Sequence, residues 1–226
     1  MHSQRKPFFP FPMCFAAVAA LAVILTGCSS IGPQANIPAP AVTSTTTDEK
    51  GASLEARATP DHLVVSASSI QVVLDDGTKG DEFGYFEPIE PVVAALTAVF
   101  GGEPVMTTYE GIPSVDYDWS GVSIGTDGPA QRPTNPEIIM HVTAAEVHGI
   151  GIETVDGIQV GDPVAVLEVA NPSHRWQRDG VEELVIKVNS VPVTPEDNER
   201  TFSVELRSCP SDGPVTEFAA PMKNFE

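Results

Sequence analysis

Residues 90–102 read EPVVAALTAVFGG, and this stretch decides the fold class because it predicts a helix with one apolar face. Its large apolar residues recur at spacings of three, four and seven, as in an amphipathic helix: Val92, Val93, Leu96, Val99 and Phe100. A proline in the first turn and a glycine pair after the last apolar residue mark its two ends. We predict a helix over residues 90–100 that buries Leu96 against a sheet and turns Thr97 away from it.

Segments on both sides of this helix have the β-branched content of strands. The predicted strands are residues 63–65, 70–74, 105–109, 117–124, 138–147, 150–155, 181–188 and 202–206. A short second helix is predicted at residues 162–167, capped by Asp162 with Pro163 at its first position. The sequence therefore predicts an α+β fold, in which one or two short helices pack on an antiparallel sheet.

The two predicted helices open segments that resemble each other. Residues 90–104 and 162–172 each have an acidic residue, a proline and a short apolar helix, then Gly or Asn and a further proline. Residues 157–164, GIQVGDPV, resemble the opening of domains in the β-lactamase-inhibitor-protein-like group, where a glycine and an acidic residue precede a small helix and strands. The resemblance implies helices on an antiparallel sheet and leaves open a duplicated unit. It implies no inhibitor activity, because fold does not give function.

The first 27 residues have the parts of a secretory leader. Arg5 and Lys6 precede an uncharged, apolar run over residues 15–25. That run is shorter than the roughly 20 residues needed to span a bilayer as a helix, so it is interpreted as a signal sequence and not as an anchor.

The leader ends in Leu25-Thr26-Gly27-Cys28, which resembles the lipobox of bacterial lipoproteins. In that family the cysteine receives a diacylglyceryl group, and the signal peptidase cuts on its N-terminal side. The resemblance implies lipidation at Cys28, cleavage between Gly27 and Cys28, and a place on the extracytoplasmic face of the cell membrane. Cys14 precedes the apolar run and does not fit the motif. The alternative is an ordinary secretory leader that ends near a cysteine.

Three parts of the chain are predicted. Residues 1–27 form the signal peptide, and residues 28–60 form a lipidated cysteine with a Pro/Thr/Ser-rich tether that has almost no large apolar residue. Such a composition cannot bury enough surface to offset its ordering entropy. Residues 61–226 form a single acidic domain.

The charge balance excludes one class of partner. The full chain has 12 Lys and Arg against 31 Asp and Glu, and removal of Arg5 and Lys6 takes the net charge from −19 to about −21. Nucleic-acid binding requires clustered cations, so no nucleic acid is expected as a partner.

The search for catalytic and metal motifs gives weak candidates. The histidines after the leader are His62, His141, His148 and His174, and none has metal-ligand spacing of the H-E-x-x-H type. A Glu146/His148 pair on one strand face is a conceivable two-ligand site, although a polar strand end is the commoner meaning. Residues 75–82, DDGTKGDE, suggest either a calcium loop or, as we favour, a solvated hairpin turn. There is no G-x-S-x-G motif, and Tyr109, Tyr117 and Trp119 are interpreted as core or sheet-face residues.

We therefore expect no cofactor, no metal and no catalytic residue. Lipidation of Cys28 would leave Cys209 without an intramolecular disulfide partner, and its Ser-Cys-Pro context suggests an inert position at a strand end. The expected function is a non-catalytic binding module for an envelope protein, a wall polymer or a small ligand. The alternative is a surface-anchored hydrolase that uses carboxylates, since 31 acidic residues allow many pairs in a fold.

Overall fold

The computed structural model describes residues 58–126, 134–171, 173–197 and 199–224. The leader, Cys28 and nearly all of the predicted tether lie outside these residues. The described part divides into two helices, α1 (Ile89–Phe100) and α2 (Val164–Ala170), and thirteen strands. The strands are β1 (Pro60–Val65), β2 (Ser69–Leu74), β3 (Lys79–Gly84), β4 (Val105–Thr108), β5 (Val115–Asp118), β6 (Val122–Thr126), β7 (Ile138–Val142), β8 (Glu146–Val147), β9 (Ile150–Thr154), β10 (Ser173–Arg178), β11 (Val181–Pro192), β12 (Thr201–Ser208) and β13 (Glu217–Asn224).

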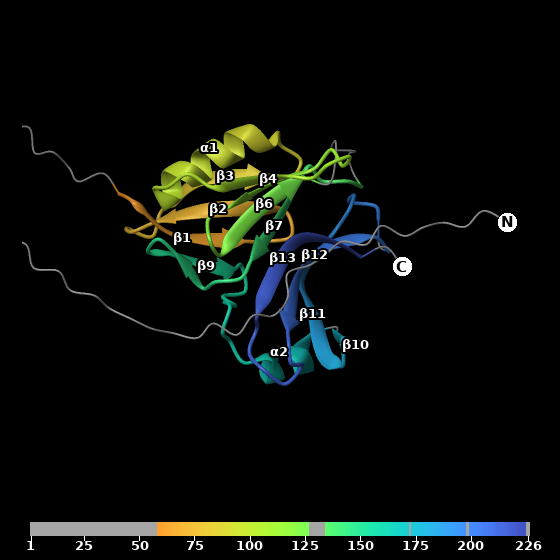
Figure 1. Ribbon diagram of the computed structural model, residues 1–226. Helices are drawn as coiled ribbons and strands as arrows, with labels where there is room; N and C mark the ends of the chain where they lie inside the picture. Colours follow the sequence, from red (N-terminus) through yellow and green to blue (C-terminus); the bar gives the residue numbers. More distant parts are fainter. Residues whose placement is uncertain (1–57, 127–133, 172, 198, 225–226) are drawn as a thin grey trace, which may run out of the picture. The chain divides into compact units, whose positions relative to one another are not determined.

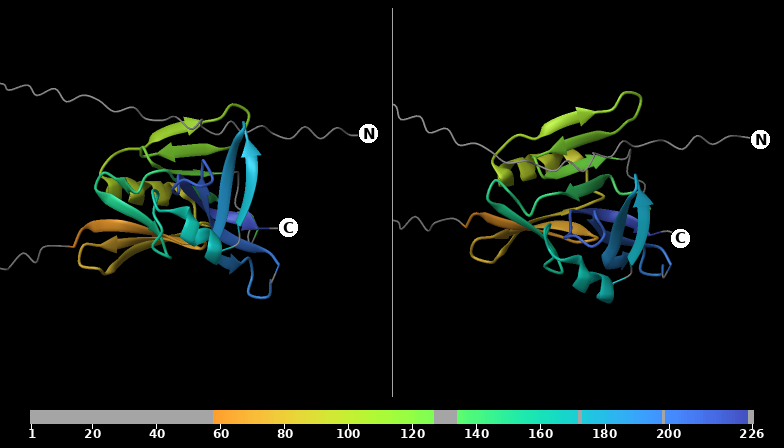
Figure 2. Two further views of the ribbon diagram at one scale, coloured as in Figure 1. Left: turned by 90° about the horizontal axis from the view of Figure 1, so that it is seen from below. Right: turned by 60° about the horizontal axis from the view of Figure 1, so that its bottom comes forward.

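The strands form two sheets (Figures 1 and 2). The small sheet has the order β3-β2-β1-β9-β8, and the large sheet has the order β10-β11-β12-β13-β7-β6-β5-β4. Every pairing is antiparallel except that of β1 with β9. The large sheet takes four strands that follow α1, β4–β7, and four that follow α2, β10–β13, and the last strands of the two sets, β7 and β13, pair with each other.

The predicted first helix is confirmed as α1, within one residue of its expected bounds. Val92 and Leu96 are fully buried, and Gly101 ends the helix in the left-handed conformation, with φ of 69° and its N–H donating to the Thr97 carbonyl. Thr97 was expected on the far side but is half-buried, and its hydroxyl has no hydrogen-bond partner among the described residues.

The core lies between the sheets and α1, because strand residues alternate between two faces and one face of each sheet is apolar. One continuous cluster joins α1 to both sheets, and its largest fully buried members include Leu63, Ile70, Leu96, Ile124, Met140, Ile152, Leu184, Leu206 and Phe218.

The second helix differs from its prediction. The side chain of Asp162 does not cap α2, because it accepts a hydrogen bond of 2.8 Å from the backbone N–H of Gln159. Only Val164 of this helix is buried, while Val166 and Val169 are 73% and 90% exposed. Two of the three valines of α2 therefore face solvent.

Two predicted strands were too long. Residues 117–124 are interrupted between β5 and β6, where Ser120 and Gly121 have φ of 62° and 140°. A Cβ at Gly121 would lie 2.7 Å from that of Ala144, so only glycine fits this turn. Residues 138–147 divide into β7 and β8. The buried Trp119 fills the first interruption, and its indole N–H donates to the carbonyl of Gly102 at 3.0 Å.

The domain is mostly strand, so the predicted α+β class is confirmed only in part: the antiparallel sheet and two short helices are present, but the helical share is small. Strands β3, β10 and β13 were not predicted, and these add to the strand content. In the described part of the chain, neither helix has the length and apolar character needed to cross a membrane.

Candidate functional site

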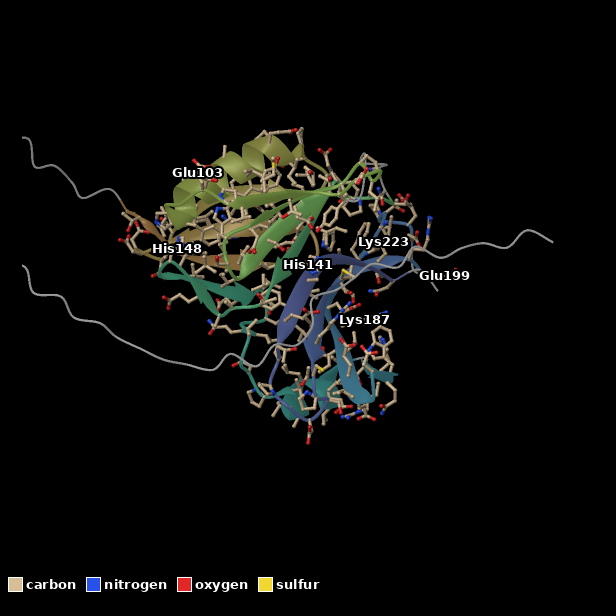
Figure 3. The ribbon with its side chains drawn as sticks, viewed as in Figure 1. Glu103, His141, His148, Lys187, Glu199 and Lys223 are labelled. Carbon is tan, nitrogen blue, oxygen red and sulfur yellow. The ribbon has the colours of Figure 1, made fainter. Side chains whose placement is uncertain are left out.

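The structure separates the four candidate histidines. His62 lies on β1, His141 on β7 and His174 on β10, while His148 lies in the turn between β8 and β9. Figure 3 shows His141 on the large sheet and His148 near Glu103, beyond the end of α1. Within the described ranges, no group of three His, Cys, Asp or Glu side chains is arranged to hold a metal ion.

Glu146 and His148 do not lie together on one strand face, as was suggested, because β8 ends at Val147. His148 is outside the strand with φ of 52°, so the alternation that would place it beside Glu146 does not apply. Its Nδ1 donates instead to the carbonyl of Phe100 at 2.8 Å, which satisfies an otherwise unpaired carbonyl near the end of α1. His148 therefore caps a helix.

The acidic segment 75–82 is a hairpin turn only in its first half. Asp76 accepts hydrogen bonds from the hydroxyl and the N–H of Thr78 at 2.6 and 2.8 Å, which lower the pKa of Asp76. Residues 79–82 belong to β3, so the turn closes sooner than expected. Asp75 also accepts two hydrogen bonds, both from Thr59. The carboxylates of Asp75 and Asp76 are therefore engaged in hydrogen bonds within the protein, which gives the calcium interpretation no support.

The face of the large sheet opposite the core is here named the outer face. Its side chains form cross-strand rows from β10 to β5, and most of them are polar or charged. These residues are Trp176, Glu183, Val185, Lys187, Glu205, Arg207, Glu217, Ala219, His141, Ser123, Asp116 and Asp118. The outer face therefore crosses the seam between β13 and β7.

A buried ionic cluster lies on this face. Arg207 binds Glu205 at 2.8 Å and Glu217 at 3.2 Å, and Glu183 is 3.8 Å away. The indole N–H of Trp176 donates to Glu183 at 2.6 Å. Burial alone would lower the pKa of Arg207, but the three carboxylates more than offset it, and the pKa is raised. The contacts of this cluster link β11, β12 and β13 and, through Trp176, β10, and loss of one member would leave a buried charge without its partner.

Sequence reasoning missed this cluster, although one signal was present. Glu205 lies on the predicted strand 202–206, and Arg207 is one residue past its predicted end, so the two share a face once the strand is extended to Ser208 as in β12. Glu183 and Glu217 could not have been added, because β13 was not predicted and the register of β11 with β12 is a tertiary property.

His141 lies beside this cluster, between Ser123 on β6 and Ala219 on β13. Loss of water around the ring lowers the pKa of His141, and the nearby Glu217 only partly opposes this effect. The folded domain therefore favours the neutral imidazole.

We expect this histidine to make the domain less stable in mild acid. Its folded pKa is below the unfolded value of about 6.5, so the unfolded chain binds more protons and stability falls as pH decreases through that value. In His141→Gln, the loss of stability between pH 7 and pH 5 should be smaller than in the wild type. Urea denaturation at several pH values measures it. His174→Gln, at an exposed position, is the control and should keep the wild-type slope.

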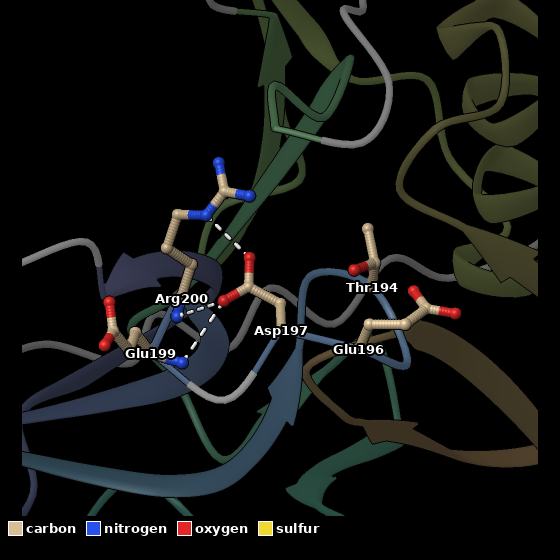
Figure 4. A pocket seen from close by; sticks show the side chains of 5 residues that line it. All are labelled: Thr194, Glu196, Asp197, Glu199 and Arg200. Carbon is tan, nitrogen blue, oxygen red and sulfur yellow. Dashed lines mark hydrogen bonds and ion pairs between the residues drawn. The ribbon is translucent and has the colours of Figure 1, made fainter.

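Two open hollows lie elsewhere on the surface. The first, of about 500 Å³, is lined by residues of the β11–β12 connection: Thr194, Glu196, Asp197, Glu199 and Arg200 (Figure 4). There Asp197 accepts a 2.8 Å hydrogen bond from the backbone N–H of Arg200 and a 2.6 Å bond from its guanidinium. Mainly the backbone bond lowers the pKa of Asp197. Asp197 and Arg200 form hydrogen bonds with each other, so the hollow belongs to a turn whose polar groups are already paired.

The second hollow, of about 320 Å³, is lined by His62 and by three acidic residues, Asp61, Glu146 and Glu153. His62 Nδ1 is 2.9 Å from Asp61, and its Nε2 is 3.8 Å from Glu153. Both ring nitrogens therefore face carboxylates, and no serine, threonine or cysteine lines this hollow.

Four exposed apolar side chains lie close together in the sequence in the hairpin of β4 and β5 and the connection between these strands. Val105 is 67% exposed and Met106 60%, and both lie on β4. Tyr109 and Ile112, in the connection, are 41% and 48% exposed. Tyr109 was expected in the core or on a sheet face, but its hydroxyl donates to Asp116 at 2.5 Å from the edge of the sheet. We name these four side chains the hairpin patch.

Cys209 directly follows β12 and is half-buried, which agrees with its expected place at a strand end. The predicted lipidation site, Cys28, and the cleavage site at Gly27 lie outside the described residues.

A model of a family of unknown function (DUF7283) matches residues 11–130, just over half of the chain. The matched range includes most of the predicted leader and extends beyond β6. Comparisons with curated proteins and with solved structures give no match.

Proposed function

The chain belongs to this family of unknown function (DUF7283), and from its residues we propose that it is a lipid-anchored binding module on the extracytoplasmic face of a cell membrane. The anchor is the lipid on Cys28. The partner is another protein of the envelope, which we favour over a wall polymer or a small ligand.

The Leu25-Thr26-Gly27-Cys28 motif at the end of an apolar run supports the anchor. A diacylglyceryl group provides two acyl chains, and two chains hold a protein stably where one binds only reversibly. Small residues before the cysteine also give a peptidase access to the backbone.

The hairpin patch is the observation that carries the binding function. Val105, Met106, Tyr109 and Ile112 lie within eight consecutive residues, and each is more than 40% exposed. Single exposed apolar residues are ordinary, but four within one hairpin, with an exposed apolar side chain on each face of β4, favour an interaction site at this hairpin. Glu103, Glu110 and Asp118 are acidic, exposed neighbours of this group.

A surface-anchored hydrolase is the second candidate, favoured by the hollow around His62 with its three carboxylates. It ranks lower because His62 is held between two of those carboxylates and faces no nucleophilic side chain in the hollow.

We also propose that the domain is a duplicated unit. In each half a helix precedes four antiparallel strands, β4–β7 after α1 and β10–β13 after α2. Counted inward from its edge, each half of the large sheet has its four strands in chain order, β4 to β7 in one half and β10 to β13 in the other. This arrangement supports the resemblance to the β-lactamase-inhibitor-protein-like group at the level of fold, and it joins the outer faces of both halves into one surface.

A photo-crosslinking experiment tests the binding function. Ile112 is replaced by benzoylphenylalanine in the lipidated protein in its native cells, and Val169, an exposed apolar residue on α2, is replaced in a control. We expect a discrete adduct with an envelope protein from position 112 and none from position 169. Equal adducts, or an adduct only from position 169, would contradict the assignment of the hairpin patch. Loss of lipid from a Cys28→Ala variant tests the anchor separately.

A further inference from the structure

Strand β4 is an edge of the large sheet, and all four of its residues, Val105–Thr108, are exposed. An edge strand presents unpaired backbone N–H and C=O groups, so it is a template for a further strand. It pairs with β5 without a register shift, so no bulge turns this edge away from a partner.

The other three edges of the two sheets are protected in ways that β4 is not. Strand β3 carries the charged Lys79, Asp81 and Glu82, and β8 has only two residues. Strand β10 carries Arg175, whose guanidinium is bound to Glu168 and Glu182 at 2.7 and 2.8 Å. Charges and short length are the ordinary means by which proteins block edge pairing. β4 has neither charge nor proline, and two of its side chains are apolar.

The described charged residues next to β4 along the chain and on β5 are all acidic. Glu103 and Glu110 flank the strand, and Asp116 and Asp118 lie on its neighbour β5. The sequence contains no Lys or Arg between Lys79 and Arg132. A strand that carries basic residues at its ends would therefore be attracted to this edge, and a strand with acidic ends would be repelled.

A second copy of this chain does not fit this charge pattern. If two β4 strands paired antiparallel about their centres, Glu103 of one copy would face Glu110 of the other at both ends. Like charges directly opposite each other destabilise a strand pair. The large net negative charge of each copy adds to this repulsion.

We propose that β4 binds an extended, β-branched segment of another protein, flanked by lysine or arginine, as an added strand of the large sheet. Main-chain hydrogen bonds provide affinity in this mode of recognition, and alternate side chains and end charges provide specificity. The inference rests on the proposed binding function and names the chemistry of the partner.

The test uses full-length protein purified in detergent and two labelled peptides. One has the sequence KKVTVTVKK and the other EEVTVTVEE, so they differ only in the charge of their ends. Fluorescence anisotropy should show binding of the lysine peptide, weakened by added salt, and little binding of the glutamate peptide. Hydrogen exchange should show new protection of backbone amides in Val105–Thr108.

Variants locate the binding site. Met106→Lys introduces the charge that commonly blocks an edge strand and should weaken binding of the lysine peptide by about tenfold or more. Val169→Lys makes the same change of charge on α2 and should leave the affinity as in the wild type. Both positions are exposed, and near-ultraviolet circular dichroism confirms that both variants are folded.

Three results would overturn the inference: equal binding of both peptides, binding that Met106→Lys leaves unchanged, or a concentration-dependent dimer that Met106→Lys abolishes. The last result would assign β4 to a second copy of the chain. If position 112 still crosslinks to an envelope protein while the lysine peptide fails to bind, the binding function is retained and strand addition at β4 is rejected.

Discussion

In cells that make a Cys28→Ala variant, lipid label should be absent from the protein and the uncut precursor should accumulate. The diacylglyceryl group is transferred to a thiol, and alanine offers no nucleophile in its place. Because the lipoprotein peptidase acts after this transfer, processing should stop as well. We expect complete loss of label and not a partial reduction.

Metabolic labelling with an alkyne fatty acid, followed by gel analysis and membrane fractionation, measures both effects. Cys14→Ala and Cys209→Ala are matched controls, because they remove the other two cysteines of the chain. Both should keep label, processing and membrane retention. If Cys28→Ala were cut and retained like the wild type, the leader would be an ordinary secretory signal and the lipid anchor would have to be withdrawn.

The first helix could be predicted from sequence because its signals are local. An apolar period, a proline in the first turn and a glycine after Phe100 all lie within the segment itself, and α1 forms there. Strand β13 has no such signal. Its Ala219, Ala220 and Pro221 are poor strand formers, and the strand exists because it pairs with β12 on one side and β7 on the other.

On the outer face, too, local sequence patterns predict one part of the arrangement and strand pairing determines the rest. That Glu205 and Arg207 share a face follows from a period of two, but their contact with Glu183 and Glu217 depends on the register of neighbouring strands. The parity argument for Glu146 and His148 failed because it assumed an uninterrupted strand, and a single residue with positive φ invalidates it. Local patterns therefore predicted elements, while side-chain constellations required the fold.

The proposed lipid anchor and the proposed binding edge, β4, are far apart in the sequence. The proposed lipid is on residue 28, and β4 begins 77 residues later in the folded domain. If the Pro/Thr/Ser-rich residues 29–59 act as the predicted tether, the anchored domain would be able to search for partners near the membrane. Anchoring raises the local concentration of the domain near other envelope proteins, so moderate affinity at β4 would suffice.

Leu96→Ala should strongly destabilise the domain. Leu96 is fully buried at the centre of the helix, in the cluster that joins α1 to both sheets. Replacement of a buried leucine by alanine costs about 2 to 5 kcal/mol, because transfer energy is lost and a cavity remains. That is a large share of the roughly 5 to 15 kcal/mol by which a domain is stable.

The next residue provides a control of opposite sign. Thr97 is half-buried, and its hydroxyl finds no partner in the part of the chain that the structure describes. Thr97→Val keeps the shape of the side chain and removes the polar atom, so the free energy of unfolding should stay the same or rise. Urea denaturation of the full-length protein, followed by circular dichroism, compares the two variants. If Leu96→Ala unfolded at the same urea concentration as Thr97→Val, the apolar face of α1 would not be packed on the sheets.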